Sequence, residues 1–241
     1  MTNLFILTGC SKGLGKALLE VLLADAENMV VGISRSPMKG AGNFKHLTLD
    51  LTDAEELSSR LDELFPEGDY KKAVLINNAG WIGEIAPIGR LEPAGIAKIH
   101  AVNVIAPAIL MNAFVQRFAM EPMEKTVVNI SSGAAEKNMD GWSGYSSSKA
   151  ALNRMTGVAQ QESEMKGYGI RYFALSPGIV DTPMQEDIRA TKQENFSHVE
   201  QFKSFKENHE LTSPSAVAEK VVFLLDHEEE FDGVLQDVRK F

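Results

Sequence analysis

The sequence predicts an α/β fold in which a doubly wound parallel sheet of about seven strands carries helices on both faces. Three observations lead to this fold class. Short runs rich in β-branched residues alternate with longer amphipathic stretches, as they do in stacked βαβ units. The strand candidates are almost continuously apolar, which suits a sheet that is covered on both faces. A glycine-rich turn at 8–15 joins the first strand candidate to the first helix candidate.

Each element follows from its local pattern. Runs of apolar or β-branched residues predict strands at 4–8, 28–34, 45–49, 73–77, 125–131, 170–175 and 233–238. Longer amphipathic stretches predict helices at 14–25, 53–64, 93–119, 143–166 and 214–226. Capping signals support two helix starts, because Thr52 or Asp53 precedes an acidic first turn and Ser213 precedes Pro214.

The length and composition favour one domain over residues 1–241. A chain of 241 residues with 44% hydrophobic residues can bury one substantial core. Length alone leaves one or two domains open, but doubly wound sheets commonly occupy this whole length. The segment 183–211 interrupts the alternation, since it is charge-mixed, sparsely apolar and too long for an ordinary connection. We expect it to form a lid over a substrate.

Composition also disfavours several classes of partner. The net charge is −9 and no stretch concentrates Lys or Arg, which disfavours nucleic acid and anionic membrane surfaces. The five histidines lack metal-ligand spacing, so no metal site is expected, and the single Cys10 permits no intrachain disulfide. A strand candidate beginning at Leu4 leaves no room for a targeting peptide. No apolar run approaches the roughly 18 residues that span a bilayer, so we expect a cytoplasmic protein.

The glycine-rich turn is the first candidate binding site. Gly9, Gly13 and Gly15 have the spacing G-x3-G-x-G between a strand and a helix, a geometry that directs backbone N–H groups at a diphosphate. Three glycines alone are weak evidence, because tight turns need glycine for steric reasons. The string Asn77-Asn-Ala-Gly80 ends the fourth predicted strand at the same edge of the sheet, although alone it also suits an ordinary turn.

The end of the second predicted strand bears on the choice of cofactor. An acidic residue there would bind a ribose 2′-hydroxyl and repel a 2′-phosphate. This chain has Ser34 and then Arg35, and Lys12 lies in the glycine-rich turn. A guanidinium and an ammonium group match a 2′-phosphate in charge and hydrogen bonding. NADP(H) is therefore the expected cofactor, the alternative being that both cations are ordinary surface charges.

Four polar residues form the candidate catalytic group. Tyr145 and Lys149 are four residues apart on a predicted helix, so they share a face. A tyrosine normally titrates near pH ~10, and we expect the Lys149 ammonium to lower that pKa. Ser132 ends the fifth predicted strand and can hydrogen-bond a carbonyl oxygen. Asn103 lies within a predicted helix and needs a specific partner for its amide, while Pro107 cannot donate to its main-chain carbonyl.

Together these strings resemble the short-chain dehydrogenase/reductase family over nearly the whole chain. The resemblance rests on residues 8–15, Asp50, 77–80, Asn103, Ser132, Tyr145-x3-Lys149 and Pro177-Gly-Ile-Val-Asp-Thr182. It implies a Rossmann fold and a catalytic tetrad of Asn103, Ser132, Tyr145 and Lys149. In this family the tyrosine is the general acid, the serine polarises the carbonyl, the lysine also binds the nicotinamide ribose, and the asparagine holds a water.

The resemblance also implies how the cofactor is held. Asp50 is expected to reach the adenine amino group, and Val180 and Thr182 the carboxamide. The complete set of expected cofactor contacts is Gly9, Ser11, Lys12, Gly13, Leu14, Gly15, Ser34, Arg35, Asp50, Leu51, Asn77, Ala79, Gly80, Tyr145, Lys149, Pro177, Gly178, Val180 and Thr182.

A narrower resemblance to one subgroup of the family bears on the substrate. It is carried by the strings 125–135, 141–145, 176–185 and 232–241. Substrates of that subgroup have vicinal dicarbonyl or α-hydroxycarbonyl groups on an aromatic or pterin body. The apolar pocket candidates near the catalytic strings are Trp81, Met139, Trp142 and Met184, which also suit ordinary core packing. The resemblance further implies a homodimer formed through the long helices 93–119 and 143–166.

The leading hypothesis is an NADPH-dependent carbonyl reductase that acts on a small diketone or a related aromatic ketone. Reduction of a 3-oxoacyl chain on an acidic carrier protein is an alternative, and it would favour a basic docking surface. The segment 183–211 mixes Arg189 and Lys192 with several acids, which argues weakly against that alternative. A catalytically idle NADP-sensing or scaffold protein is the third hypothesis, but all four tetrad residues are retained.

Overall fold

A parallel sheet of seven strands runs through the centre of the structure, a computed structural model that describes residues 2–241. Its strand order is β3-β2-β1-β4-β5-β6-β7 and every pairing is parallel. The order reverses between β1 and β4, so the carboxyl ends of these strands flank a crevice. The strands are β1 (Thr2–Thr8), β2 (Asn28–Ser34), β3 (Phe44–Thr48), β4 (Tyr70–Asn77), β5 (Glu124–Ile130), β6 (Ile170–Ser176) and β7 (Leu235–Asp237).

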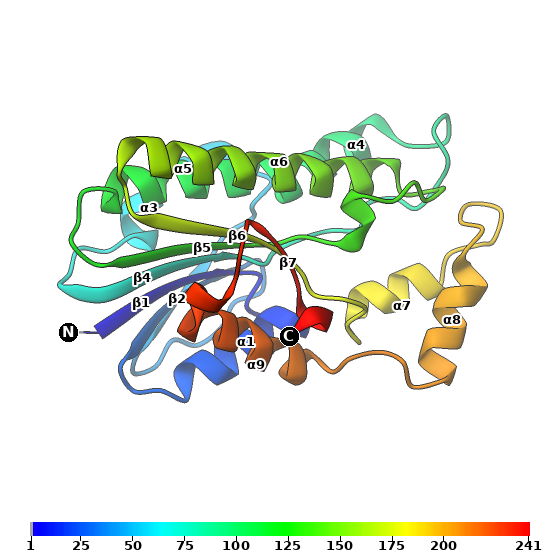
Figure 1. Ribbon diagram of the computed structural model, residues 1–241. Helices are drawn as coiled ribbons and strands as arrows, with labels where there is room; N and C mark the ends of the chain where they lie inside the picture. Colours follow the sequence, from blue (N-terminus) through cyan, green and yellow to red (C-terminus); the bar gives the residue numbers. More distant parts are fainter. Residues whose placement is uncertain (1) are drawn as a thin grey trace.

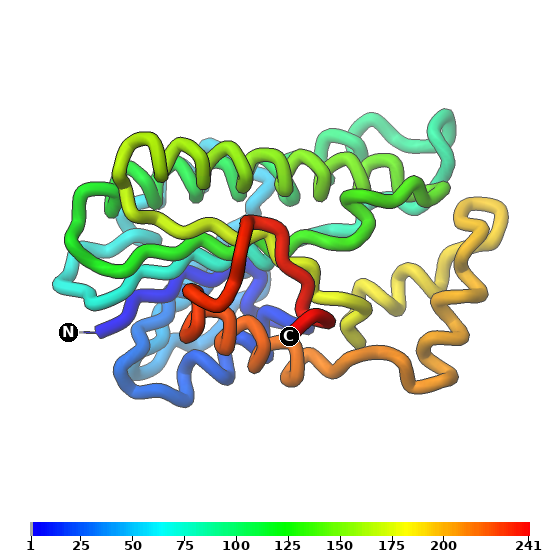
Figure 2. The backbone as a smooth tube through the Cα atoms, viewed as in Figure 1, coloured from blue at the N-terminus to red at the C-terminus, as the bar shows by residue number. Residues whose placement is uncertain are grey.

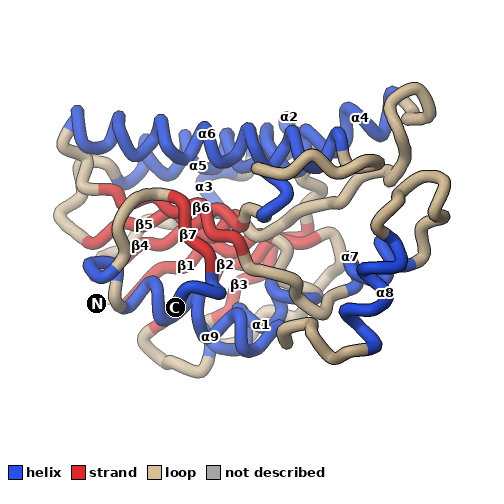
Figure 3. The backbone as a smooth tube through the Cα atoms, turned by 45° about the vertical axis from the view of Figure 1, so that its right-hand side comes forward, coloured by secondary structure: helices blue, strands red, loops and turns tan. Residues whose placement is uncertain are grey.

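Helices cover both faces of this sheet (Figures 1 and 3). One layer holds α1 (Gly13–Leu23) and α9 (Pro214–Asp226), which lie side by side below the strands in Figure 1. The other layer holds α4 (Pro93–His100), α5 (Ala106–Phe118) and α6 (Ser143–Lys166), with α2 (Ala54–Ser59) and α3 (Leu61–Leu64) near its edge. Each layer encloses its own apolar core against the sheet. The predicted doubly wound fold is thereby confirmed.

The helix predicted at 53–64 is interrupted. Asp53 caps α2 by accepting the Glu56 N–H at 2.8 Å, as the sequence indicated. The hydroxyl groups of Ser58 and Ser59 then donate to main-chain carbonyls of the same helix at 2.7 and 2.8 Å. Such bonds compete with the helical pattern, and α2 ends at Arg60 (φ −112°, ψ 14°) before α3 begins.

The helix predicted at 93–119 also changes its form along its length. A π-helical segment, Ala101–Ile105, separates α4 from α5, and the Ala106 N–H donates to the Ala101 carbonyl five residues earlier. Pro107 explains the change, because it has no N–H with which to continue the α-helical pattern. Asn103 lies inside this wider turn.

The expectation that no apolar run is long enough to span a bilayer is wrong for this region. By length and composition the continuous helix Pro93–Phe118 qualifies, with a mean hydropathy of 1.6 over 18 residues, a third of which are buried in the fold. Part of that apolar character belongs to the core. Leu110, Phe114 and Phe118 are fully or almost fully buried against the sheet, and Phe65 packs edge-on against both phenylalanines.

The segment 183–211, here called the lid segment, extends beyond the carboxyl ends of the strands (Figure 2). It departs from the alternation of the fold, as the sequence indicated, but it is not a plain loop. It contains α7 (Pro183–Arg189) and α8 (Val199–Glu207), whose buried apolar side chains belong to a third apolar cluster, separate from the two sheet cores.

Candidate active site

A cavity of about 930 Å³ opens where the carboxyl ends of the strands face the lid segment. This volume lies within the range of small-molecule and cofactor sites. Every residue expected to contact the cofactor lines the cavity, with the single exception of Asn77. The four apolar pocket candidates, Trp81, Met139, Trp142 and Met184, line it as well.

The glycine-rich turn forms one wall of this cavity from main-chain atoms. Gly9 and Gly13 have φ values of +71° and +54°, a left-handed conformation that glycine adopts without strain. A Cβ atom at Gly15 would lie 2.1 Å from the Gly9 carbonyl oxygen, so only glycine permits this approach. Helix α1 begins here without a side-chain cap or an acidic residue in its first turn. Its free N–H groups suit an anionic diphosphate, so the site fits a dinucleotide.

Residues of the Asn-Asn-Ala-Gly string hold that turn in place. The position of Asn77 differs from the prediction that it contacts the cofactor. Thr8 Oγ1 accepts the N–H groups of Asn78 and Ala79 at 3.0 and 2.9 Å, and Asn78 Nδ2 donates to the Thr8 carbonyl at 2.9 Å. Asn77 is 2% exposed, and its Nδ2 donates to Asn129 Oδ1 at 2.8 Å inside the sheet core. As the last residue of β4, Asn77 is directed into the core, and Asn78 lies on the cavity in its place.

The cationic corner predicted for a 2′-phosphate is present. Arg35 and Lys12 are both exposed, both line the cavity, and neither pairs with an acidic side chain of residues 2–241. The Ser34 hydroxyl is occupied within the protein. It donates to the Ser36 carbonyl at 2.9 Å and lies 2.8 Å from His46 Nε2.

Asp50 also lines this side of the cavity, and its own carboxylate is ionised. The Thr52 N–H and hydroxyl both donate to Asp50 Oδ1 at 3.0 Å. The Thr52 main-chain bond, helped by the positive charges of Arg35 and Lys98, holds the Asp50 pKa below its usual range. Among residues 2–241 nothing donates to Asp50 Oδ2, so that oxygen is available to a donor on a ligand.

Tyr145 and Lys149 lie on one face of α6, as their spacing predicted, and both line the cavity. They are 8% and 3% exposed, and Lys149 Nζ lies 5.9 Å from the centre of the tyrosine ring. Lys149 Nζ donates to the Ile130 carbonyl at 2.7 Å, which fixes the amine at the end of β5. Ser132 follows the same strand, and its Oγ accepts the Ala134 N–H at 3.1 Å.

The predicted lowering of the Tyr145 pKa is wrong for this structure. Burial raises the Tyr145 pKa because a phenolate loses its hydration, and the neighbouring Ser132 hydroxyl offsets only part of that rise. Burial also lowers the Lys149 pKa to about 8. Desolvation is therefore the largest influence on the pKa of both groups. Tyr145 holds its proton firmly, while Lys149 exchanges one close to neutral pH.

Asn103 has the specific partner that its place in the helix required. Its Oδ1 accepts the Trp81 N–H at 2.9 Å, and its Nδ2 donates to the Trp81 carbonyl at 2.9 Å and to Ser148 Oγ at 3.0 Å. The side chain is buried behind the cavity. A Cβ atom on Gly80 would lie 3.5 Å from Lys149 Nζ and 3.7 Å from Asn103 Oδ1, so Asn103 and Lys149 approach the same glycine.

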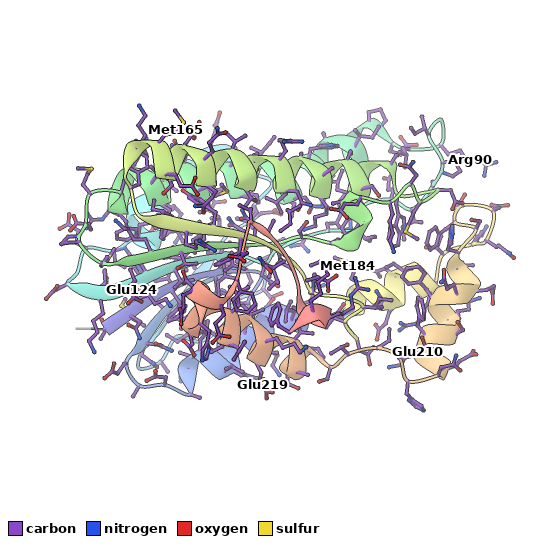
Figure 4. All side chains as sticks on the ribbon, in the orientation of Figure 1. Arg90, Glu124, Met165, Met184, Glu210 and Glu219 are labelled. Atoms are coloured by element: carbon purple, nitrogen blue, oxygen red, sulfur yellow. The ribbon has the colours of Figure 1, made fainter. Side chains whose placement is uncertain are left out.

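Aromatic side chains form the other half of the cavity. Trp142 is 6% exposed and stacks on Phe196 of the lid segment with ring centres 5.0 Å apart. Its ring also meets the Tyr145 ring edge-on at 5.6 Å. Met184 lies at the start of α7, beside this half of the cavity (Figure 4). The half-buried residues that pack against the same cluster are Trp81, Ile85, Met139, Met184 and Phe205.

The sequence reasoning missed several residues that line the cavity, most of them in this half. The missed lining residues include Lys98, Gln185, Ile188, His198, Gln201, Phe202, Phe205 and Arg239. A signal was available in the lid segment, since 184 and 188 are four residues apart and 202 and 205 are three apart. Read as helical faces, these spacings predict α7 and α8 and their inward residues.

One acidic residue ties the lid segment to the loop before α6. Asp140 accepts the Ser197 N–H at 2.7 Å, the Ser197 hydroxyl at 2.8 Å and a bond from His198 Nδ1 at 3.2 Å. The next residue, Gly141, has a φ of +72°, and a Cβ atom there would lie 2.4 Å from the Asn195 carbonyl oxygen. The close approach of the lid segment therefore depends on this Asp-Gly pair.

The cavity joins a place for a dinucleotide to a buried tyrosine and lysine, an arrangement that suits a dinucleotide-dependent oxidoreductase. In agreement, residues 3–193 match the sequence profile described as short chain dehydrogenase. The chain belongs to that family, whose members use a nicotinamide cofactor and act on carbonyl or alcohol groups.

Similar proteins point the same way. The chain is 36% identical to benzil reductase ((S)-benzoin forming) of Bacillus subtilis, with 99% of each protein covered. It is 29% identical to sepiapterin reductase of Bos taurus, over 94% of this chain and 90% of that protein. The crystal structure of the KRED1-Pglu enzyme has 28% identity and a TM-score of 0.84, covering 97% of this chain and 100% of that one.

Proposed function

We propose that this protein is an NADPH-dependent carbonyl reductase whose substrate is a small 1,2-diketone or α-hydroxyketone with an aromatic or pterin-like body. One observation carries the proposal. The Tyr145–Lys149 pair lies where the main-chain half of the cavity meets its aromatic half, so a dinucleotide and a ketone can both reach it. The likeness to benzil reductase and sepiapterin reductase supports the substrate class.

In this proposal the hydroxyl groups of Ser132 and Tyr145 bind the carbonyl oxygen and orient the ketone. Bound NADPH supplies the hydride that the carbonyl carbon accepts. The oxygen then takes a proton from Tyr145, so the ketone becomes an alcohol and the tyrosine becomes a phenolate. Because burial raises the Tyr145 pKa, the proton moves only when the oxygen has gained alkoxide character.

Lys149 is proposed to restore that proton. Its pKa of about 8 suits a group that gives and regains a proton near neutral pH. Asn103 is proposed to hold a water for this transfer through its main-chain carbonyl, since its side-chain amide is already bonded to Trp81.

The choice of NADPH rests on the cationic corner. Arg35, after β2, and Lys12, in the glycine-rich turn, make no ion pair with an acidic side chain of residues 2–241. No acidic residue ends β2, where it would bind a ribose 2′-hydroxyl. Oxidation of NADPH and NADH should be followed across a panel of 1,2-diketones, pterins, quinones and acyl thioesters. We expect turnover with a diketone and NADPH, and about a tenfold or greater selective loss of NADPH affinity in Arg35→Ala.

The panel also separates the alternatives. Lys39→Ala is the matched control, because Lys39 is an exposed cation near Arg35 that does not line the cavity. Equal losses of NADPH and NADH affinity in Arg35→Ala contradict the 2′-phosphate assignment. Activity confined to acyl thioesters would favour the carrier-protein reductase. Tight cofactor binding without turnover of any substrate would favour the sensing or scaffold role.

We also propose that two copies associate through α5 and α6. Apolar side chains on this layer are exposed, among them Ile105 at 47%, Val158 at 45% and Met165 at 74%. Burial of these side chains in a partner would be favourable. Light scattering of the purified protein should give twice the chain mass, and a monomer at micromolar concentration contradicts the proposal.

A further inference from the structure

His46 lies outside the cavity but is bonded to both ends of the segment that carries Arg35. The histidine is on β3, next to the end of β2. Its Nε2 lies 2.8 Å from Ser34 Oγ, and its Nδ1 accepts the Met38 N–H at 3.3 Å. Ser34 Oγ in turn donates to the Ser36 carbonyl at 2.9 Å. The ring therefore bridges the turn from 34 to 38.

The donors in this network leave one arrangement of protons. The Met38 N–H can only donate, so His46 Nδ1 must be unprotonated. The single proton of the Ser34 hydroxyl goes to the Ser36 carbonyl, so that oxygen accepts from His46 Nε2–H. The network consequently requires neutral His46 with its proton on Nε2. A second proton on Nδ1 would oppose the Met38 N–H and remove that bond.

The surroundings of the ring also favour the neutral form. His46 is partly buried beside Phe44, whose ring centre lies 6.1 Å away, and this burial lowers the His46 pKa. Charged residues on the neighbouring segments are Arg35 and Lys39 after β2 and Lys45 on β3, and all three are exposed. The Cys10 thiol lies behind Ser34, and burial raises its pKa, so it stays neutral. No acidic side chain among residues 2–241 makes an ion pair with the ring.

We propose that neutral His46 is a positioning residue that holds the Arg35 turn in the shape that receives a 2′-phosphate. This inference rests on the proposed use of NADPH. Ser34, Arg35 and Ser36 line the cavity, whereas His46 does not, so the ring acts through them. NADH lacks the 2′-phosphate and depends far less on this turn. Protonation of His46 therefore releases the turn and lowers the affinity for NADPH more than that for NADH.

The test is a fluorescence titration of NADPH and NADH between pH 5 and 8. His46→Gln keeps a donor near Ser34 but does not titrate, and His46→Phe keeps the ring shape without either bond. We expect His46→Phe to lose about tenfold in NADPH affinity at pH 7.5, with NADH affinity changed less than about twofold. His227→Gln, which changes a histidine outside the cavity, is the control.

The pH profile separates positioning from a merely structural role. The 2′-phosphate itself takes up a proton near pH ~6, which weakens NADPH binding in every variant. His46→Gln measures this weakening alone. As the pH is lowered, the NADPH affinity of the wild type should fall more steeply than that of His46→Gln. Because linkage is reciprocal, NADPH should also lower the His46 pKa observed by NMR in the wild-type protein, while NADH should move it less.

Four results would overturn the inference. Parallel pH profiles for wild type and His46→Gln would show that the ring does not control NADPH binding. A rise of the His46 pKa on adding NADPH would mean that the imidazolium contacts the phosphate directly. The NMR measurement needs no variant, so it stands even if His46→Phe does not fold. A wild-type protein that does not prefer NADPH overturns the proposed function and this inference together, whereas a preference unchanged in both His46 variants overturns the inference alone.

Discussion

The two halves of the cavity are built from different parts of the chain. The glycine-rich half is a surface of main-chain N–H groups, held in place because a Cβ atom at Gly15 would lie 2.1 Å from the Gly9 oxygen. The half under the lid segment is a surface of side chains, where Trp142 stacks on Phe196 at 5.0 Å and meets Phe202 at 5.4 Å. Among the four catalytic candidates, Tyr145 is the one whose side chain belongs to the aromatic cluster itself.

This difference determines which changes of sequence each half of the cavity can tolerate. A main-chain site recognises a diphosphate through its N–H groups, and it tolerates no side chain where the backbone is as close as it is at Gly15. An aromatic cluster recognises its ligand by shape and apolar area, so it can change residue by residue with the substrate. We therefore expect the glycine-rich half to stay the same across the family and the lid half to vary with the substrate.

The largest expected effect comes from Tyr145→Phe, which changes the residue between the two halves. We expect kcat to fall by about 10²–10⁴-fold, the usual contribution of a general acid. NADPH affinity should stay within about twofold, and the Phe ring should keep its edge-on contact with Trp142. Steady-state kinetics and a fluorescence titration of NADPH measure the two quantities.

Tyr172→Phe is the matched control for that variant, since Tyr172 is a buried tyrosine on β6 that does not line the cavity. Turnover retained in Tyr145→Phe would remove Tyr145 from its proposed role. The wild-type rate of ketone reduction should also fall as the pH rises through about 8, where Lys149 loses its proton.

A smaller effect, confined to the lid half, is expected for Phe196→Ala. Phe196 is fully buried in the lid segment, and removing such a ring typically costs about 3–5 kcal/mol. The lid segment should open more often, so trypsin should cut faster at Arg189 and Lys192 and the KM for the ketone should rise about tenfold. NADPH affinity should change less than about twofold.

Phe223→Ala is the control, because that ring lies on α9, away from the lid segment, and is 41% exposed. A parallel loss of NADPH affinity and lid protection in Phe196→Ala would mean that the two halves form one cooperative unit. The comparison between them would then fail.

The same difference explains what was predictable from sequence. The glycine-rich turn, the parallel sheet and the Tyr145–Lys149 face follow from local spacing, because strand and helix periods fix which side chains share a surface. Asn77 was wrongly assigned to the cofactor because the direction of the last residue of a strand depends on the strand's register in the sheet, which one string does not show.

The remaining misses concern burial and distant contacts. The Tyr145 pKa rises because its side chain is buried in the cluster that contains Trp142 and Phe196, and the loss of hydration outweighs the bond from Ser132. The lid segment itself looked sparsely apolar because its few large side chains are spread over two short helices and the turn between them, which carries Phe196. They form a cluster only when Trp142, which precedes α6, is placed against them.

The smallest expected effect comes from Asp140, which joins the lid segment by hydrogen bonds rather than by apolar contact. The Ser197 N–H holds the Asp140 pKa below its ordinary value of about 3.9. The stabilisation is therefore present above about pH 4 and is lost as the pH falls through the lowered pKa. At pH 7, Asp140→Ala should speed tryptic cleavage of the lid segment about three- to tenfold, since the bonds are exposed and partly screened.

Two further variants make this last prediction specific. Asp140→Asn keeps an oxygen that can accept the Ser197 N–H, so it should lie between wild type and Asp140→Ala. Glu194→Ala removes an exposed acid of the same segment that makes no side-chain hydrogen bond or ion pair among residues 2–241, and it should leave cleavage unchanged. Equal cleavage in Asp140→Ala and Glu194→Ala would show that the aromatic cluster alone holds the lid segment. In that case hydrogen bonding would contribute nothing measurable to the side-chain half of the cavity.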